Sequence, residues 1–131
     1  MKKIAMGLTL AVTSTCALAN WTEVASSDDG KVTYFADPAT IRRIGPKVKV
    51  WTLTDYKEAR VLAGDVQFLS TKVQEEFDCV EQTARHLNMS AFSANMGNGK
   101  LVGSEKNPDK GRPVTQESVT EEMWKFACGK K

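Results

Sequence analysis

The sequence predicts an exported α+β domain held together by one disulfide bond. Alternating apolar and polar residues, separated by turn-forming clusters, fill much of the first half of the chain and are typical of β-strands. A capped helical segment lies near the carboxyl end, and two cysteines remain once an export leader is set aside. The length of 131 residues fits one domain rather than several.

Residues 1–19 have the pattern of a cleaved secretory signal peptide. Two lysines precede the apolar run 4–12, and small residues lead up to Asn20, before which we expect cleavage. The run is shorter than the roughly 18 apolar residues that span a bilayer, so we expect no membrane-spanning segment in the mature chain. A lipoprotein signal at Cys16 is an alternative, although Thr13 stands where such signals usually carry an aliphatic residue.

The mature chain, residues 20–131, is electrically balanced. It keeps all 16 acidic side chains, and the loss of Lys2 and Lys3 leaves an equal number of basic ones. A nucleic-acid-binding domain normally carries a pronounced positive charge. We therefore expect no nucleic-acid partner.

Export leaves Cys79 and Cys128 as a pair in an oxidising compartment. One disulfide between them is the expected outcome. Closing a loop of about 50 residues would stabilise the domain by roughly 4 kcal/mol in the chain-entropy description. Two free thiols are the alternative, and neither arrangement has the Cys-x-x-Cys spacing of a redox pair or the neighbouring ligands of a metal site.

The first residues after the leader predict a β-hairpin. Residues 21–25 and 31–36 are strand-like, and the turn cluster 26–30 lies between them. Asp37-Pro38 ends the second strand, because proline cannot donate a hydrogen bond to a neighbouring strand.

A short strand and a central strand follow. Residues 41–44 form the short strand, which ends at the Gly45-Pro46 turn. Residues 47–56 place apolar groups on both faces, which is typical of a strand in the middle of a sheet.

Residues 66–96 give contradictory signals. Apolar residues recur at spacings of three and four with helix-favouring residues between them, so the pattern alone favours a helix. Some of these residues also share the parity of a strand, and asparagines and serines weaken the far end of any helix. The apolar stripe consists of Val73, Phe77, Val80, Ala84, Leu87 and Ala91.

The segment after this stripe predicts a second hairpin. The motif Met96-Gly97-Asn98-Gly99 is a strong signal for a tight turn, since Asn-Gly tolerates positive φ angles. Residues 100–103 would form the returning strand, and residues 107–113 a loop.

A helix closes the domain. Ser118 and Glu121 form a capping-box pattern, and apolar residues follow at helical spacing up to Gly129, a fitting C-terminal stop. Because Cys128 lies at the end of this helix, we expect the helix to pack on the sheet with its apolar stripe inward.

Short motifs recur along nearly the whole mature chain. They are Trp21, Tyr34-Phe35-Ala36-Asp37-Pro38, Thr40-Ile41-Arg42-Arg43, Val50-Trp51, Asp55-Tyr56, Ser70, Glu76-Phe77-Asp78-Cys79, Arg85, Met96-Gly97-Asn98-Gly99 and Phe126-Ala127-Cys128. No single motif is specific, but in order and spacing the set resembles bacterial surface-adhesin protein E and its relatives, small exported proteins of Gram-negative bacteria.

The resemblance implies a mainly antiparallel β-sheet with a C-terminal helix. In similar proteins the segment around the first cysteine is strand, turn and strand. On this basis we expect strands at residues 70–78 and 85–94 with a turn near Glu81, in place of the helix that the apolar stripe favours.

No catalytic constellation stands out, so we expect neither enzyme activity nor a cofactor. His86 is the only histidine, and an acid–base proposal would combine it with Ser70 or Ser90 as nucleophile and Asp78 as orienting group. Neither serine has a nucleophile-elbow motif around it. A histidine on a strand surface explains His86 equally well.

Metal binding has little support in the sequence. His86, Met89 and Met96 offer soft ligands that suit Cu(I), but methionines at such positions are more often core residues. Several acids lack the loop pattern of a Ca²⁺ site and are better explained as a solvated face. These acids are Glu75, Glu76, Asp78 and Glu81.

The best candidate for ligand binding is the turn at Gly45-Pro46. Four cations flank it and would gather at a hairpin tip, where they could bind a sulfated polysaccharide, an acidic protein segment or lipopolysaccharide phosphates. Protection of an edge strand by positive charge is the alternative. The four cations are Arg42, Arg43, Lys47 and Lys49.

Three aromatic residues are candidate interface anchors. Trp51, Tyr56 and Trp124 could supply them, since aromatics are enriched in the cores of binding interfaces. Their strand and helix periodicity favours the alternative, that they belong to the core.

The resemblance implies an envelope binding protein similar to the protein E adhesins, which are known for attaching to host extracellular-matrix and plasma proteins such as vitronectin and laminin. The alternative is a periplasmic housekeeping protein that binds or inhibits another envelope protein. A family likeness does not fix the ligand, because function resides in sites rather than in folds.

Overall fold

The computed structural model describes residues 20–130, so the expected signal peptide and Cys16 lie outside the described residues. One helix, α1 (Val119–Cys128), and two short 3-10 helices, η1 (Pro38–Thr40) and η2 (Asn95–Gly97), accompany the strands. The strands are β1 (Thr22–Ser26), β2 (Val32–Ala36), β3 (Arg42–Ile44), β4 (Lys47–Val61), β5 (Gln67–Asp78), β6 (Thr83–Phe92), β7 (Leu101–Glu105) and β8 (Arg112–Pro113).

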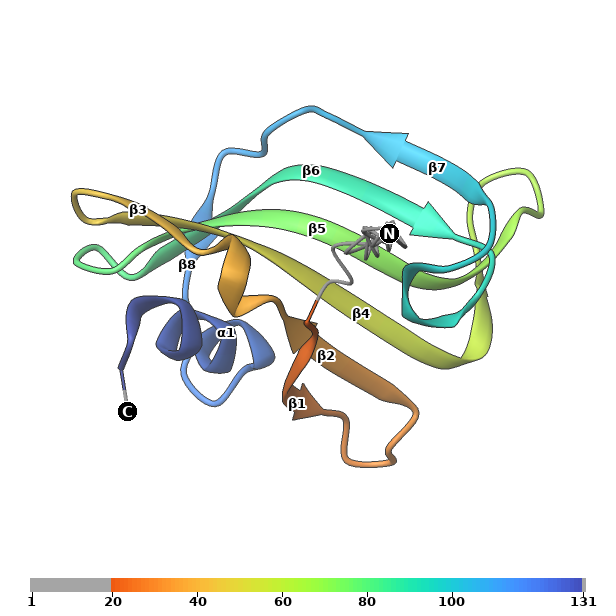
Figure 1. Ribbon diagram of the computed structural model, residues 1–131, viewed down its shortest axis with the longest axis horizontal. Helices are drawn as coiled ribbons and strands as arrows, with labels where there is room; N and C mark the ends of the chain where they lie inside the picture. Colours follow the sequence, from red (N-terminus) through yellow and green to blue (C-terminus); the bar gives the residue numbers. More distant parts are fainter. Residues whose placement is uncertain (1–19, 131) are drawn as a thin grey trace, which may run out of the picture.

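All strands of the described part belong to one antiparallel sheet, with α1 packed beneath one of its faces (Figure 1). The main order is β1-β2-β4-β5-β6-β7, while β3 pairs with β4 and β8 pairs with β6. The expected fold, a mainly antiparallel sheet with a C-terminal helix, is therefore confirmed. None of the helices within residues 20–130 has the length and apolar character needed to cross a membrane.

The first hairpin, β1 and β2, is confirmed, and its turn is held by two polar side chains. The Ser27 N–H donates to the carbonyl of Val32 at 2.8 Å. Asp29 Oδ1 accepts from the Ser27 hydroxyl at 2.7 Å and from the Lys31 N–H at 3.0 Å. Gly30 completes the turn with a φ of 72°, which a residue with a side chain adopts less readily.

The central strand β4 is confirmed, but it is longer than the sequence predicts. β2 and β3 pair with one edge of it and β5 with the other, and it continues past Tyr56 to Val61. Val48 and Val50 are buried in the core between the sheet and α1. Leu53 is buried on the opposite face, beside Gly97 of η2. Both faces are covered, as the apolar residues on both sides predict.

The helix that the apolar stripe favours is wrong, and the two strands implied by the resemblance are confirmed with shifted bounds. β5 begins before residue 70, and β6 spans residues 83–92 rather than 85–94. A β-bulge at Leu87 lies between the pairs Gln74–Asn88 and Glu75–His86.

The bulge explains why these strands imitate a helical stripe. Val73 and Phe77 share a face because their spacing of four is also a multiple of two. Ala84 and Ala91 are seven apart, an odd spacing that would place them on opposite faces of a regular strand, and the extra residue at Leu87 returns them to one face.

The second hairpin is confirmed, since β6 and β7 form an antiparallel pair, but its tight turn is not centred on Asn98-Gly99. Met96 and Gly97 instead have φ angles of 57° and 72°, and the Asn98 N–H donates to the Asn95 carbonyl at 3.1 Å. Residues 93–100 form a longer loop around η2, because side chains of β4 and β5 accept hydrogen bonds from its backbone. Asp55 Oδ1 accepts from the Met96 N–H at 2.8 Å, and Ser70 Oγ accepts from the Gly97 N–H at the same distance.

Two neighbouring segments also differ from the prediction in their bounds. The returning strand spans residues 101–105 rather than 100–103. The expected loop at residues 107–113 ends in the two residues of β8, which pair with Thr83 and Ala84 of β6.

Helix α1 is confirmed with both of its expected ends. The Glu121 N–H donates to Ser118 Oγ at 3.1 Å, and Gly129 ends the helix in the left-handed region with a φ of 68°. Its apolar side faces the sheet and forms the main core together with residues of β2, β4, β5 and β6. The buried members of this core are Ala36, Val48, Val50, Phe77, Ala84, Met123, Trp124, Ala127 and Cys128.

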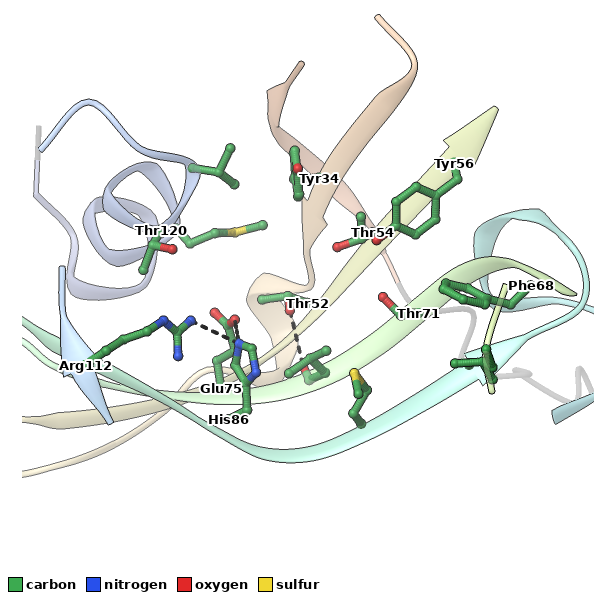
Figure 2. Close-up of a pocket in the computed structure, with 16 residues that line it drawn as sticks. Tyr34, Thr52, Thr54, Tyr56, Phe68, Thr71, Glu75, His86, Arg112 and Thr120 are labelled. Carbon is green, nitrogen blue, oxygen red and sulfur yellow. Dashed lines mark hydrogen bonds and ion pairs between the residues drawn. The ribbon is translucent and has the colours of Figure 1, made fainter. Parts of the chain in front are cut away.

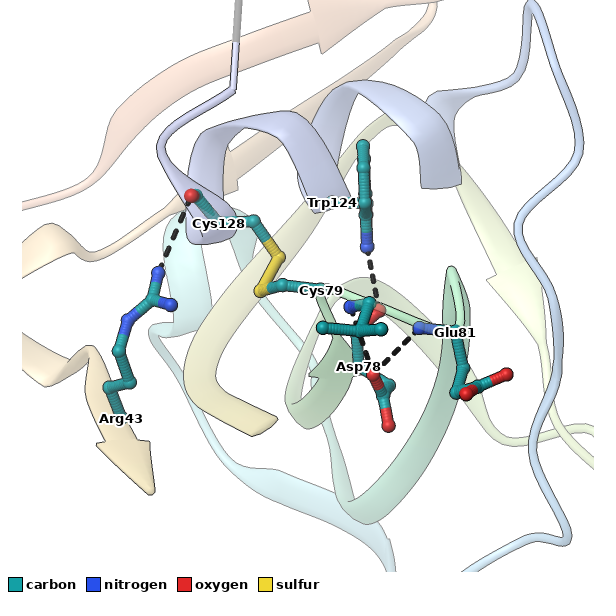
Figure 3. The surroundings of a disulfide bond; sticks show 7 residues. Arg43, Asp78, Cys79, Glu81, Trp124 and Cys128 are labelled. Carbon is teal, nitrogen blue, oxygen red and sulfur yellow. Dashed lines mark hydrogen bonds between the residues drawn. A yellow bond between two sulfur atoms is a disulfide. The ribbon is translucent and has the colours of Figure 1, made fainter. Parts of the chain in front are cut away.

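The expected disulfide joins Cys79, directly after β5, to Cys128, the last residue of α1 (Figure 3). It closes a loop with a sequence separation of 49 residues. The free-thiol alternative is therefore wrong, and the helix is covalently fastened to the sheet.

Candidate functional site

The basic hairpin, defined here as residues 42–49, consists of β3 and the first residues of β4, which also pair with β5. Arg42 lies opposite Lys49 and Ile44 opposite Lys47, whereas Arg43 lies opposite the buried Val48. Side chains of directly paired residues share a face of the sheet. Arg42, Lys47 and Lys49 therefore lie on the face away from α1, and the structure separates Arg43 from them.

Arg43 points toward the end of the helix instead. Its Nη2 donates to the carbonyl of Cys128 at 3.4 Å (Figure 3). A guanidinium at a helix C-terminus stabilises the exposed carbonyls and the negative end of the helix dipole. This contact gives Arg43 a structural role.

Two of the other three cations also have polar partners close by. Arg42 Nη1 donates to the carbonyls of Ala39 and Ile41 at 3.0 and 2.9 Å. Lys47 Nζ lies 3.9 Å from the buried Glu76 carboxylate, which also binds Arg85 Nε at 2.8 Å. The Glu76 carboxylate on β5 therefore neutralises part of the positive charge of the hairpin. Beside the turn, Ile44 has an exposure of 75%.

A second candidate site lies on the other face of the sheet, beside α1. This sheet cavity has a volume of about 420 Å³ and is lined by side chains from β2, β4, β5, β6, β8 and α1 (Figure 2). The sheet surface that lines it includes Thr54 of β4, Thr71 of β5 and Ala91 of β6. Such a volume falls in the range of small-molecule sites.

One end of the sheet cavity is charged. His86 Nε2 lies 3.0 Å from Glu75 Oε1 and 3.1 Å from Arg112 Nη2, as Figure 2 shows. Arg112 Nη1 also lies 3.5 Å from Asp109 Oδ2, and the Asp109 N–H donates to the His86 carbonyl at 3.0 Å. This network fastens the segment before β8 onto β6.

The electrostatics of this network favour an ionised Asp109. Partial desolvation acts to raise the pKa of the Asp109 carboxyl. Hydrogen bonds from the backbone N–H groups of Gly111 and His86, together with the charges of His86 and Arg112, outweigh it and lower the pKa below 3.8.

The other end of the cavity is aromatic. The rings of Tyr56 and Phe68 pack edge to face with centroids 5.7 Å apart, and the Arg60 guanidinium lies 4.9 Å from the centre of the Tyr56 ring. Burial raises the pKa of the Tyr56 hydroxyl above 10.0, and Tyr34 adds to this effect while Arg60 opposes it. The cavity therefore runs from a charged end to an apolar one.

The catalytic hypothesis is not supported by the positions of its residues. Ser70 is buried opposite Phe92, and its hydroxyl donates a hydrogen bond to the Ala94 carbonyl at 2.6 Å. Asp78 Oδ1 accepts from the N–H groups of Val80 and Glu81 and thereby orders the β5–β6 turn.

The second possible nucleophile does not fit either. Ser90 pairs with Lys72, whose neighbours in the structure are the rings of Trp21 and Phe92. These lie on the face away from α1, whereas His86 lies on the cavity face. Neither serine is brought to the histidine.

The proposed metal ligands are not brought together in the structure either. His86 and Met89 both line the sheet cavity, but Met96 lies in η2 and is not among the lining residues. Glu75 and Glu76 point to opposite faces because they are consecutive in β5. Within residues 20–130, no group of three or more histidine, cysteine or acidic residues could hold a metal ion.

The three aromatic candidates separate in the structure. Trp124 is a core residue with an exposure of 8%, as its periodicity predicts. Tyr56 lines the cavity, and Trp51 is half-buried in the central strand.

Sequence reasoning missed the sheet cavity as a site. The alternating pattern predicts that Thr52, Thr54 and Tyr56 share one face of β4. Their neighbours on β5 and β6, however, depend on the strand register and on the bulge at Leu87. Arg112 had no local signal at all, because its role comes from the pairing of β8 with β6.

Comparisons with known proteins agree with this fold. Crystal form II of Haemophilus influenzae protein E has a TM-score of 0.65 and 9% identity, with 82% of this chain and 87% of that chain covered. Protein E from non-typeable Haemophilus influenzae has a TM-score of 0.60 and 13% identity, with 84% of each chain covered. At such identities the likeness supports the fold alone.

The sequence itself matches a known family. No protein of curated function shows a significant sequence match. Residues 21–129, however, match the family described as Surface-adhesin protein E, which accounts for nearly all of the described residues. The chain therefore belongs to the surface-adhesin protein E family.

Proposed function

We propose that the protein is an exported binding protein of the bacterial envelope that attaches to host extracellular-matrix or plasma proteins. The match of residues 21–129 to a family described as a surface adhesin carries this proposal. A single disulfide-fastened sheet with an exposed basic hairpin supports a role in binding rather than in catalysis.

The proposed contact is the face of the basic hairpin that carries Arg42, Lys47 and Lys49. This face is accessible because Arg42 and Lys47 are exposed, and a partner with acidic or sulfated groups would complement it. Rim charges of this kind mainly increase the association rate and make binding sensitive to salt. Arg43 is left out of the proposed contact because it binds the helix end.

Location on the cell is the first test. Protease treatment of intact cells should digest the protein if it is displayed at the surface, with a periplasmic protein as the protected control. Digestion only after permeabilisation of the outer membrane would contradict the host-binding proposal. It would instead favour the alternative role as a periplasmic partner of another envelope protein.

The hairpin contact needs a charge-matched comparison. Replacing Arg42, Lys47 and Lys49 by serine should weaken binding to immobilised matrix and plasma proteins, and the loss should shrink at high salt. The control variant replaces the exposed Lys57, Lys100 and Lys106 by serine and changes the net charge equally. Equal binding by the two variants would remove the hairpin from the proposal while leaving the family role intact.

A further inference from the structure

The sheet cavity is separate from the basic hairpin, because it lies on the opposite face of the sheet. Its volume of about 420 Å³ would hold a small molecule, and most of its wall is apolar. The apolar side chains that line its length include Phe68, Val73, Met89, Ala91, Val119 and Met123.

The two charged side chains that line the cavity beside His86 are opposite in sign. The carboxylate of Glu75 and the guanidinium of Arg112 lie on either side of His86, and Asp109, which pairs with Arg112, is not among the lining residues. A ligand with a net charge would lose hydration in this partly open site without meeting an excess of the opposite charge, which is unfavourable. The wall therefore suits an uncharged ligand.

The hydrogen bonding at His86 leaves capacity for a ligand head group. Its Nε2 lies 3.0 Å from Glu75 Oε1 and 3.1 Å from Arg112 Nη2. This nitrogen can donate to Glu75 when it carries a hydrogen, or accept from Arg112 when it does not, but it cannot do both. Either Glu75 or Arg112 therefore keeps hydrogen-bonding capacity that a ligand in the cavity can use.

We propose that the sheet cavity binds an uncharged amphiphile with an amide-type head. The head carbonyl accepts from Arg112, the head N–H donates to Glu75, and the apolar body extends along β4, β5 and β6 toward Tyr56 and Phe68. A head with an adjacent donor and acceptor satisfies both side chains of the charged end at once. This proposal does not rest on the host-binding role.

The test uses three probes with one apolar body and different heads: octanamide, octanoate and octylamine. Calorimetric titration of the folded protein should show octanamide binding about tenfold more tightly than either charged probe, since one additional hydrogen bond to a partly buried charged group has that effect. Tighter binding of octanoate or octylamine, or binding of none of the three, would overturn the proposal.

Charge variants make the head-group assignment specific. Glu75→Gln removes the carboxylate that lines the cavity, while Arg112 keeps its pair with Asp109, and should shift the preference toward octanoate. Arg112→Gln should shift it toward octylamine, each by about fivefold. Unchanged preferences in both variants would contradict the placement of the head between these two residues.

A filling variant tests the location of the apolar body. Thr54→Phe adds a ring inside the cavity and should abolish octanamide binding. The matched control is Thr33→Phe, because Thr33 pairs with Asp55 on the other face of the sheet. An intact disulfide and an unchanged unfolding midpoint show that each variant is folded, and full binding by a folded Thr54→Phe protein would overturn the proposal.

Discussion

The indole Nε1 of Trp124 donates a 2.9 Å hydrogen bond to the backbone carbonyl of Asp78, directly before the disulfide-bonded Cys79 (Figure 3). The helix is thus fastened to the end of β5 by a covalent link and a hydrogen bond that lie side by side. The position of α1 also sets one wall of the sheet cavity, through Val119, Thr120 and Met123.

Removal of the disulfide should destabilise the domain without changing its fold. The double variant Cys79→Ser, Cys128→Ser should lower the free energy of unfolding by about 2–5 kcal/mol, because the unfolded chain regains the freedom of a long loop. Denaturant titration of the variant and of the oxidised wild type measures this difference. Identical midpoints would contradict a stabilising role for the disulfide.

The Trp124 hydrogen bond should have its own measurable contribution. Trp124→Phe keeps an apolar ring in the core but leaves the Asp78 carbonyl without its donor, at a cost of about 1–3 kcal/mol. Trp51→Phe serves as the comparison, since Trp51 is only half-buried. We expect a smaller loss there, and the reverse order would argue against the hydrogen bond as the cause.

Ser70 should be a stability residue rather than a catalytic one. Its fully buried hydroxyl donates to the Ala94 carbonyl and accepts from the Gly97 N–H. Ser70→Ala removes both bonds and should cost about 2 kcal/mol in urea unfolding. Ser90→Ala, at a half-buried position in β6, should change stability by less than about 0.5 kcal/mol.

Tyr56 should ionise late in an alkaline titration. The chain has two tyrosines, so a Tyr34→Phe variant leaves Tyr56 as the only phenol, and its ultraviolet absorbance should change at a pH above 10.0. Since its folded pKa is raised, its contribution to stability is complete below about pH 10 and is lost as the pH rises through the folded pKa. Titration at or below the ordinary value would show that the cavity end is open to water.

The contribution of Asp109 to stability should be lost at acid pH, whereas that of Tyr56 is lost at alkaline pH. Its folded pKa lies below 3.8, so its stabilising effect is present above about pH 4 and disappears as the pH falls through the folded value. The measurement is the difference in unfolding midpoint between Asp109→Asn and wild type at several pH values. That difference should shrink toward acid pH, and a constant difference would point to a cause other than charge.

Local features of the sequence predict several elements correctly because short-range chemistry determines them. Ser118 and Gly129 set the ends of α1 through backbone hydrogen bonding and a left-handed φ. The Asp29-Gly30 turn likewise forms from contacts within the first hairpin.

The errors occur where distant contacts decide the structure. The apolar stripe from Val73 to Ala91 resembles a helical pattern because of the β-bulge at Leu87. The bulge places Ala84 and Ala91 on the same face of the sheet, whereas a regular strand would place them on opposite faces. The Met96–Gly99 motif forms its tight turn at Met96-Gly97 instead of Asn98-Gly99, where the Met96 and Gly97 N–H groups donate to Asp55 and Ser70. Such partners lie far away in the chain and leave no local trace.

The same division applies to the candidate sites. The sequence alone determined the basic hairpin, since Arg42, Lys47 and Lys49 lie within a few residues of one turn, and it determined the disulfide, since two cysteines remain after the expected leader. Only the tertiary structure decided that Arg43 binds the helix end and that Glu75, His86 and Arg112 meet in one cavity. Strand register and helix docking bring these groups together, and both depend on packing over the whole sheet rather than on any local pattern.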